Sequence, residues 1–305
     1  MLLAKELKKN YEENRIEPFQ AEKLIFEGVG GKDVYNITAP FVIQNERIIA
    51  GRVESRDSEA SEVHFFVLKD GKWTPKKDAM VLTLQDPFIT FIDNELILGG
   101  VRTFPREDNP TMLGWKTVFY RGTSLSELKE FFAGPNGMKD LRLVQLQDGK
   151  IGIFTRPQGE KGGRGKIGYA CVDRLEDLTV EVVEEAPIFT DQFDDAEWGG
   201  CNEIHVLKDG TLGIVGHIGS FDEEENRHYY SMTFRMNVET GERTDLKLLA
   251  VRSDFLPSEA KREDLVDVVF SGGLIRHSNG TATLYAGISD AAAQCITIPD
   301  PFAGC

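Results

Sequence analysis

Polar and apolar positions alternate with a period of two over most of this chain, as in strands that bury one face. The clearest segment is 86–100, where Asp86 and Pro87 are followed by an apolar run, the pair Asp93-Asn94 and a second apolar run. Asp and Asn favour tight turns because their side chains bond to nearby backbone and tolerate left-handed conformations. Segment 86–100 is therefore predicted to be a β-hairpin with a carboxylate at its start.

The same hairpin plan returns along the chain, at segments 39–51, 86–100, 141–155, 202–217 and 271–288. Counted from Ala39, Asp86, Asp140, Asn202 and Ser271, the repeats start 47, 54, 62 and 69 residues apart. Each interval leaves space for two further strands, and apolar alternation predicts outer strands at 64–68, 117–120, 166–171 and 229–234.

A four-stranded antiparallel unit that recurs at such spacing indicates an all-β fold, a five-bladed β-propeller in which blades cover one another's faces. A β-sandwich would also alternate, but it offers no reason for one hairpin to return five times. Segment 1–24 has apolar positions at helical spacing and is expected to form a short N-terminal helical arm. The predicted domains are this arm, 1–24, and a catalytic propeller, 25–305.

The composition limits the kinds of partner and the cellular compartment that we expect for this protein. The formal charge of −15 argues against a nucleic-acid groove, which needs clustered Lys and Arg. No stretch approaches the roughly 20 apolar residues of a membrane span, and the start does not resemble a signal peptide. The four cysteines show neither CxxC pairing nor zinc spacing, so we expect reduced thiols in a cytoplasmic protein: Cys171, Cys201, Cys295 and Cys305.

Innermost strands of a propeller all start on one face, so residues at the starts of first strands and the ends of second strands should converge. The residues before or at the first strands are Asn36, Asp86, Lys139, Asp140, Asn202 and Glu203. Those after the second strands are Arg52, Glu54, Arg102, Arg156, His217 and Asp290. Each alone could be a turn former, a solvated ion pair or a core histidine. Together, at equivalent positions of five repeats, they predict a polar ligand site.

A funnel of carboxylates, arginines, an asparagine and a histidine suits a polyhydroxylated ligand such as a sugar. Trp73, Trp115 and Trp198 are candidates for stacking on it, and Trp198 directly precedes the fourth inner strand. The acidic run 191–197 lacks the alternating ligands and central glycine of a calcium loop, so we interpret it as solvated and predict no metal site.

Several short motifs carry a resemblance to a known family. They are Gly-Arg-Val-Glu at 51–54, Gln-Asp-Pro-Phe at 85–88, Met-Lys-Asp at 138–140, Thr-Arg-Pro-Gln at 155–158, Gly-His-Ile-Gly at 216–219, Val-Phe-Ser-Gly-Gly at 269–273 and Tyr-Ala-Gly-Ile-Ser-Asp at 285–290. In order and spacing they resemble the five-bladed mannoside phosphorylases and mannosidases of glycoside hydrolase family 130. They are still more similar to glycosyltransferase family 108, a former domain of unknown function. Gln85 and Phe88 replace the charged neighbours usual around the family's acid, and Leu-Val-Gln-Leu at 143–146 replaces its phenylalanine-proline continuation in the third blade. Both departures fit the transferase-like branch better than the phosphorylase branch.

The resemblance, which runs from about Asn36 to Asp290, implies an inverting β-mannoside phosphorylase or mannosyltransferase acting on β-linked, β-1,2 mannooligosaccharides. Asp86 would be the catalytic acid, acting directly or through a sugar hydroxyl. The expected substrate-binding residues are Asn36, Arg52, Glu54, Arg102, Asp140, Glu203 and Asp290. Lys139, Arg156 and His217 are expected to form a cationic clamp for inorganic phosphate. Phosphate would be the co-substrate, and no cofactor is expected.

Three alternatives remain at this point. An inverting mannosidase would need a second carboxylate, Glu203 or Asp140, to activate water. Transfer from a nucleotide sugar such as GDP-mannose follows from the resemblance alone. A non-catalytic sugar-binding propeller or interaction scaffold is the rival from another class. The expected ligands are an oligosaccharide together with phosphate, a sugar phosphate or a nucleotide sugar. We expect no binding to nucleic acid or membrane. Assembly into a homo-oligomer is possible on this interpretation of the sequence.

Overall fold

The computed structural model describes residues 3–15, 20–189 and 191–304, and these form a predominantly β structure. Residues 1–2 and 16–19 of the predicted arm, and the Cys305 thiol, lie outside the described residues. The described helices are α1 (Ala4–Asn14), α2 (Gly159–Gly162) and α3 (Val180–Glu185), with 3₁₀ turns at Leu175–Asp177, Arg252–Asp254 and Glu263–Leu265. None of the helices in these ranges is long and apolar enough to cross a membrane.

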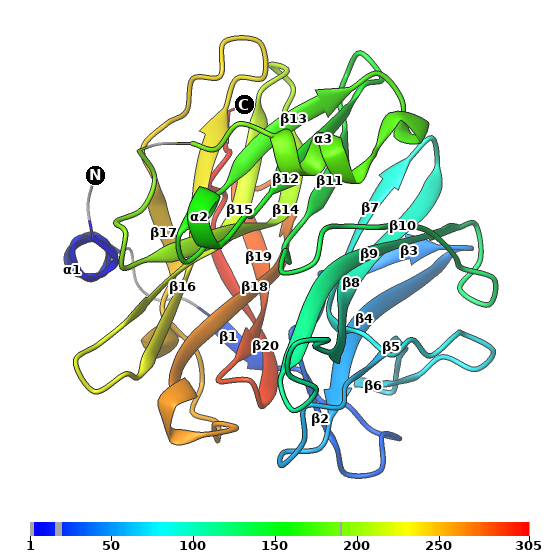
Figure 1. Ribbon diagram of the computed structural model, residues 1–305. Coiled ribbons are helices and arrows are strands. Elements are labelled where there is room, and N and C mark those ends of the chain that lie inside the picture. Colours follow the sequence, from blue (N-terminus) through cyan, green and yellow to red (C-terminus); the bar gives the residue numbers. More distant parts are fainter. Residues whose placement is uncertain (1–2, 16–19, 190, 305) are drawn as a thin grey trace.

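Two groups of strands form the N-terminal half, drawn in blue to green in Figure 1. The first group is β2 (Asp33–Tyr35), β3 (Phe41–Ile43), β4 (Glu46–Glu54), β5 (Glu62–Lys69) and β6 (Lys72–Pro75). The second group is β7 (Gln85–Ile92), β8 (Glu95–Pro105), β9 (Leu113–Gly122) and β10 (Lys129–Ala133). Asp93 and Asn94, with φ of 50° and 63°, form the turn from β7 to β8, as the Asp-Asn pair predicts.

Three further groups complete the chain. The third is β11 (Arg142–Gln145), β12 (Ile151–Thr155) and β13 (Gly168–Val172). The fourth is β14 (Trp198–Val206), β15 (Leu212–Phe221), β16 (Arg227–Met236) and β17 (Lys247–Ala250). The fifth is β18 (Asp267–Arg276), β19 (Thr281–Ile288) and β20 (Ala292–Pro299), to which β1 (Gln20–Lys23) adds a strand by pairing with β20. Part of the predicted arm therefore belongs to the last group.

The five predicted hairpins are confirmed, as are the four predicted outer strands. Hydrogen bonding nevertheless joins the groups into four sheets, because β16 and β18 pair in parallel at His228 with Asp267 and at Tyr229 with Val268. The sheet topology thus does not confirm five separate blades. Neighbouring groups are in contact in sequence order, through β4 with β7, β7 with β11, β11 with β14 and β14 with β18, and β2 contacts β19 and β20.

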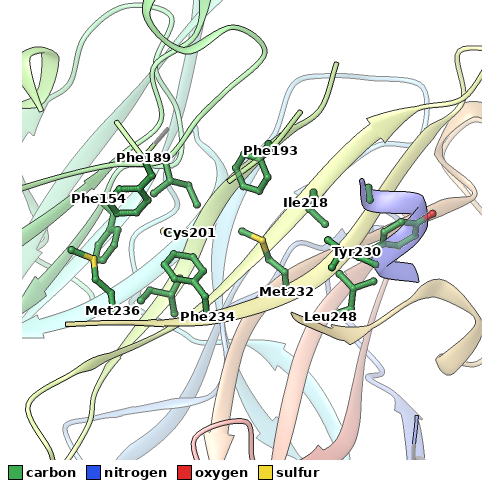
Figure 2. Packing of buried hydrophobic residues seen from close by; sticks show 14 of the residues in the cluster. Phe154, Phe189, Phe193, Cys201, Ile218, Tyr230, Met232, Phe234, Met236 and Leu248 are labelled. Carbon is green, nitrogen blue, oxygen red and sulfur yellow. The ribbon is translucent and has the colours of Figure 1, made fainter. Parts of the chain in front are cut away.

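Apolar side chains fill the spaces between neighbouring groups. Figure 2 shows the cluster between the third and fourth groups, where Phe154, Met232 and Phe234 pack together. Ala4 and Leu7 of α1 extend this cluster, and α1 lies against β17 and β15 at the edge of the molecule (Figure 1). Burial of such side chains contributes about 25 cal/mol per Å² of apolar surface, so this packing holds the groups at fixed positions around the site.

Candidate active site

Four polar residues that the repeat singles out share an uncommon backbone conformation. Asn36, Asp86, Asp140 and Asp290 have φ of 43°, 49°, 61° and 51°. Asn and Asp enter this left-handed region more readily than most residues, which explains their use here. At Asp86 the conformation coincides with a β-bulge between Gln85 and Phe88, a device that redirects a side chain at the start of a strand.

These residues meet in one cavity of about 240 Å³, which we call the chamber. Seven of the predicted site residues line it: Asn36, Arg52, Asp86, Lys139, Asp140, His217 and Asp290. Its remaining walls come from residues that were not among the predicted site residues: Glu59, Gln85, Arg227, Tyr229, Lys261, Arg262, Leu265, Val268 and Phe270.

Asp86 is held through one of its two oxygens. Asn36 Nδ2 donates to Asp86 Oδ1 at 2.8 Å, and Arg52 Nη1 donates to the same oxygen at 3.1 Å. No donor among the described residues reaches Oδ2. The carboxyl group is thus fixed in orientation through Oδ1, while Oδ2 is left without a hydrogen bond from the described residues.

Arg52 is fixed from behind by Glu54. Its Nη2 donates to Glu54 Oε2 at 2.6 Å, while Tyr35 donates to Oε1 at 2.7 Å and Lys261 donates to the same Oε1. Burial acts to raise the pKa of Glu54, but Arg52 and the hydrogen bonds from Lys261, Ser61 and Tyr35 outweigh it and lower that pKa to about 2. Glu54 is therefore an ionised support that keeps the guanidinium aimed at Asp86, rather than a chamber wall.

Asp140 is surrounded by cations. Arg156 Nη1 lies 3.0 Å from Asp140 Oδ2, and Arg142 Nη2 lies 3.8 Å from Oδ1. Burial acts to raise the pKa of Asp140, but these arginines overcome it and lower the pKa to about 2. A Cβ on Gly200 would stand 3.1 Å from atoms of Asp140, Arg156 and His217, so any larger residue there would press on all three side chains.

His217 is buried and is uncharged, whereas the prediction made it part of a cationic clamp. Its Nδ1 donates to Asn202 Oδ1 at 2.8 Å, since an amide oxygen only accepts, and its ring lies between those of Tyr229 and Phe270. Burial lowers the pKa of His217 to about 3, so the ring is neutral at pH 7 and Nε2 is an acceptor. The positive charge of the predicted clamp must come from Arg156 and Lys139 alone.

This buried histidine predicts acid sensitivity. His217 takes up a proton near pH 6.5 in the unfolded chain but only near pH 3 in the folded one, so the unfolded state binds more protons as the pH falls between these values. Protonation of His217 in the unfolded chain should therefore reduce the free energy of unfolding by on the order of 1.4 kcal/mol for each pH unit below about pH 6. Urea denaturation of the wild type and of His217→Gln at pH 7, 6 and 5 measures it. Parallel pH profiles of the two proteins would contradict the prediction.

The other charged groups of the site divide into paired and unpaired ones. Arg156, which lines the adjoining cavity rather than the chamber, donates from Nε to the carbonyl of Gly199 at 3.0 Å as well as to Asp140. Lys139 makes no hydrogen bond or ion pair with any described residue, although it lines the chamber. The carboxylate of Asp290 also lacks a hydrogen-bond donor among the described residues, and burial, with Asp86 nearby, raises its pKa against the pull of Arg52.

Two predicted site residues lie elsewhere. Arg102 pairs with Glu130 at 3.0 Å and with the Tyr120 hydroxyl at 2.9 Å, because its side chain turns toward the outer strands of its own group. Glu203 accepts from the backbone N of Leu274 at 2.6 Å and bonds to His205, since the bulge between Cys201 and Glu203 shifts the alternation of β14. The placement of Arg102 and Glu203 in the common cavity is therefore wrong.

A second cavity of about 400 Å³, the vestibule, adjoins the chamber and shares Glu59, Gln85, Lys139, Arg227 and Tyr229 with it. Trp115 and Trp198, two of the predicted stacking residues, line the vestibule. Trp73 does not, because it is buried in the core against Phe26. Among the residues that the structure describes, one carboxylate, that of Glu59, lines the vestibule together with four basic side chains: Lys139, Arg156, Arg164 and Arg227.

The residues missed by sequence reasoning come from positions outside the hairpin starts. Lys261 and Arg262 lie in the long connection between β17 and β18, and Glu59 lies in the loop between β4 and β5. A pair of adjacent basic residues just before the fifth hairpin was a signal for Lys261 and Arg262. Arg227 carries no comparable signal, because it begins an outer strand.

A family model described as a protein of unknown function (DUF1861) matches residues 10–304. The chain belongs to the DUF1861 family. No curated protein sequence matches it. Among solved structures, it is similar to the mannose phosphorylase MPT-4 from Leishmania mexicana, solved with phosphate, at 35% identity and a TM-score of 0.89 over 98% of this chain and 93% of that one.

A GDP-Man-dependent mannosyltransferase from the same organism, MPT-1, is 31% identical with a TM-score of 0.88, over 99% of this chain and 95% of that one. A β-1,2-mannobiose phosphorylase from Listeria innocua shares the fold at 12% identity and a TM-score of 0.63, over 93% of this chain and 92% of that one. The predicted resemblance is confirmed, and with it the prediction of an enzyme of the glycoside phosphorylase or glycosyltransferase type.

Proposed function

We propose that this protein is an inverting β-mannoside phosphorylase and mannosyltransferase that acts on β-linked mannooligosaccharides. The observation that carries the proposal is that one chamber holds both Asp86, with one carboxyl oxygen that receives no hydrogen bond from the described residues, and Lys139, a cation with no hydrogen bond or ion pair among those residues. The first is suited to protonate a leaving group and the second to attract an anion. The choice of β-1,2 linkages rests on the family resemblance.

In this proposal phosphate attacks C1 of the terminal mannosyl group while Asp86 delivers a proton to the glycosidic oxygen, directly or through a sugar hydroxyl. The C1–oxygen bond to the rest of the chain breaks, and a bond from C1 to a phosphate oxygen forms on the opposite face. Lys139 and Arg156 donate to the phosphate, and neutral His217 can accept from its hydroxyl. The reverse reaction lengthens the chain from mannose 1-phosphate.

The other polar groups of the chamber would hold the mannosyl hydroxyls. Asn36 and Arg52 border the acid, and Asp290 offers an acceptor or, when protonated, a donor. Asp140 is better suited to orienting Arg156 than to activating water, since its pKa is held low by the arginines. This favours phosphorolysis over the hydrolysis that Asp140 or Glu203 would have supported.

We also propose that the fold is a five-bladed propeller spanning 25–305, with β1 of the 1–24 arm completing the last blade. The support comes from the order of contacts, because each group of strands touches the next and the first touches the last. On this proposal the pairing of β16 with β18 is a local contact between two adjacent blades.

Phosphorolysis predicts a strict dependence on phosphate. Incubated with β-1,2-mannobiose or longer mannooligosaccharides, the protein is expected to release mannose 1-phosphate only when phosphate is present. Chromatography with phosphate analysis separates the products. Free mannose formed without phosphate would overturn the phosphorylase proposal in favour of hydrolysis.

Transfer from a nucleotide sugar is the second candidate. Four basic side chains around the vestibule could hold a diphosphate, and a relative that is 31% identical is a GDP-Man-dependent mannosyltransferase. Supplying GDP-mannose or mannose 1-phosphate as the only donor, with mannobiose as acceptor, discriminates the two. Chain growth from GDP-mannose alone would establish the second candidate.

A further inference from the structure

A third cavity continues outward from the vestibule. This trough has a volume of about 890 Å³ and shares Leu113, Trp115 and Gln158 with the vestibule. One wall is the far end of the β8–β9 hairpin, residues 104–108 and 113–115, and the other is formed by 135–138 together with the segment around α2. Chamber, vestibule and trough are therefore neighbouring cavities in a row that leads away from Asp86.

The sizes of the three cavities restrict what each can hold. Typical small-molecule sites measure roughly 300–1,000 Å³. At about 240 Å³ the chamber falls below this range and suits a single sugar unit beside the acid. A longer chain must extend beyond the chamber into the vestibule and the trough. The trough has by far the largest volume of the three cavities.

Charge separates the vestibule from the trough. The vestibule has an excess of basic side chains, whereas the trough combines Arg106 and Lys161 with Glu107, Asp108 and Glu184. Arg106 is moreover paired with Asp108 through two hydrogen bonds of 2.9 and 2.5 Å. A phosphate or nucleotide is thus attracted to the vestibule, and an uncharged chain is the ligand that matches the trough.

Trp115 stands where the two cavities meet. Its ring lines both, and its indole Nε1 is buried without a hydrogen-bond acceptor among the described residues. This donor is covered by protein, so Trp115 can offer a ligand in either cavity only the apolar surface of its side chain. Leu113 beside it is 44% exposed and lines both cavities, so it adds apolar surface at this junction.

We propose that the trough binds the uncharged oligomannoside chain that accepts or carries the reacting mannose, with Trp115 as the stacking platform at its mouth. The proposal rests on the proposed function for the identity of the sugar. It adds that the enzyme selects chains by length, because each further unit gains contacts along the path from the vestibule to Arg106 and Lys161.

The test compares acceptors of increasing length. With mannose 1-phosphate as donor, kcat/KM is measured for mannose and for β-1,2-linked chains of two, three and four units. The wild type should prefer the longer chains, and Trp115→Ala should reduce the ratio of kcat/KM for mannotetraose over mannose about tenfold. Leu113→Asn, at an exposed position that tolerates a polar residue, should reduce the ratio in the same direction by a smaller factor.

Phe91→Ala is the matched control, since Phe91 is an aromatic residue that is 40% exposed on β7 and lines none of the three cavities. It should leave the ratio at the wild-type value. If Trp115→Ala and Leu113→Asn each lowered kcat/KM by the same factor at every chain length, the trough proposal would be overturned. The phosphorylase activity would still be established.

A direct binding measurement keeps the trough separate from the catalytic proposal. Isothermal titration of the wild type with mannotetraose, in the absence of any donor, should give binding that weakens about tenfold in Trp115→Ala and does not change in Phe91→Ala. This result supports the trough even if no mannosyl transfer is observed. Equal affinity in the wild type and Trp115→Ala would overturn it.

Discussion

Replacing Asp86 by Asn is expected to lower kcat for phosphorolysis by roughly two to four orders of magnitude. The amide keeps the size of the carboxyl group and can still be contacted by Asn36 and Arg52, but it cannot transfer a proton to the glycosidic oxygen. Release of mannose 1-phosphate at saturating mannooligosaccharide and phosphate measures the effect.

Asp93→Asn is the matched control for this variant. Asp93 lies in the same β7–β8 hairpin at the opposite end, in a left-handed conformation that Asn also adopts readily. Its activity should equal that of the wild type.

Asp86→Asn should also retain affinity for the sugar. Undiminished turnover in Asp86→Asn would disprove the role of Asp86 as the acid, and a wild type that binds sugar without turnover would indicate the non-catalytic alternative.

Replacing Arg52 by Met is expected to reduce the free energy of unfolding by about 3–5 kcal/mol. Arg52 is 5% exposed and lies between Asp86 and Glu54, so its loss leaves two buried carboxylates without their shared guanidinium. Lys261 and Tyr35 still contact Glu54, which places the effect toward the lower end of this range. Urea denaturation at pH 7 measures the loss.

Arg102→Met provides the comparison for Arg52. Arg102 also pairs with a glutamate, but both side chains of the Arg102–Glu130 pair are 35% exposed. Water screens such pairs, so the expected change in the free energy of unfolding is within about 1 kcal/mol. Equal losses in the two variants would show that burial does not distinguish the two ion pairs.

The positions of several site residues follow from local sequence alone. The turn pairs and the period-two alternation locate the hairpins, and the polar residues at hairpin starts then fall at equivalent places. Asn36, Asp86, Asp140 and Asp290 were found in this way, and all four are Asn or Asp because their backbone is left-handed. These signals need no knowledge of the neighbouring strands.

The same reasoning misplaced Arg102 and Glu203 and did not find Arg227 or Lys261. A long side chain can turn toward either end of its strand, and only the three-dimensional positions of Glu130 and Tyr120 decide that Arg102 points outward. Glu203 was displaced by a bulge that leaves no mark in the alternation. Lys261 reaches Glu54 from a loop 207 positions away, which repeat phasing cannot reveal.

The sequence by itself determined the five hairpins, the residues that open them and the family to which they point, because turn geometry and strand alternation are local properties. The tertiary structure decided how the charges combine. Asp140 is ionised and His217 is neutral because strands distant in sequence bury both and bring Arg156 and Arg142 close, where their charges favour a carboxylate and disfavour a protonated imidazole. Desolvation and ion pairing depend on what surrounds a group in space, and the order of residues along a chain does not contain that information.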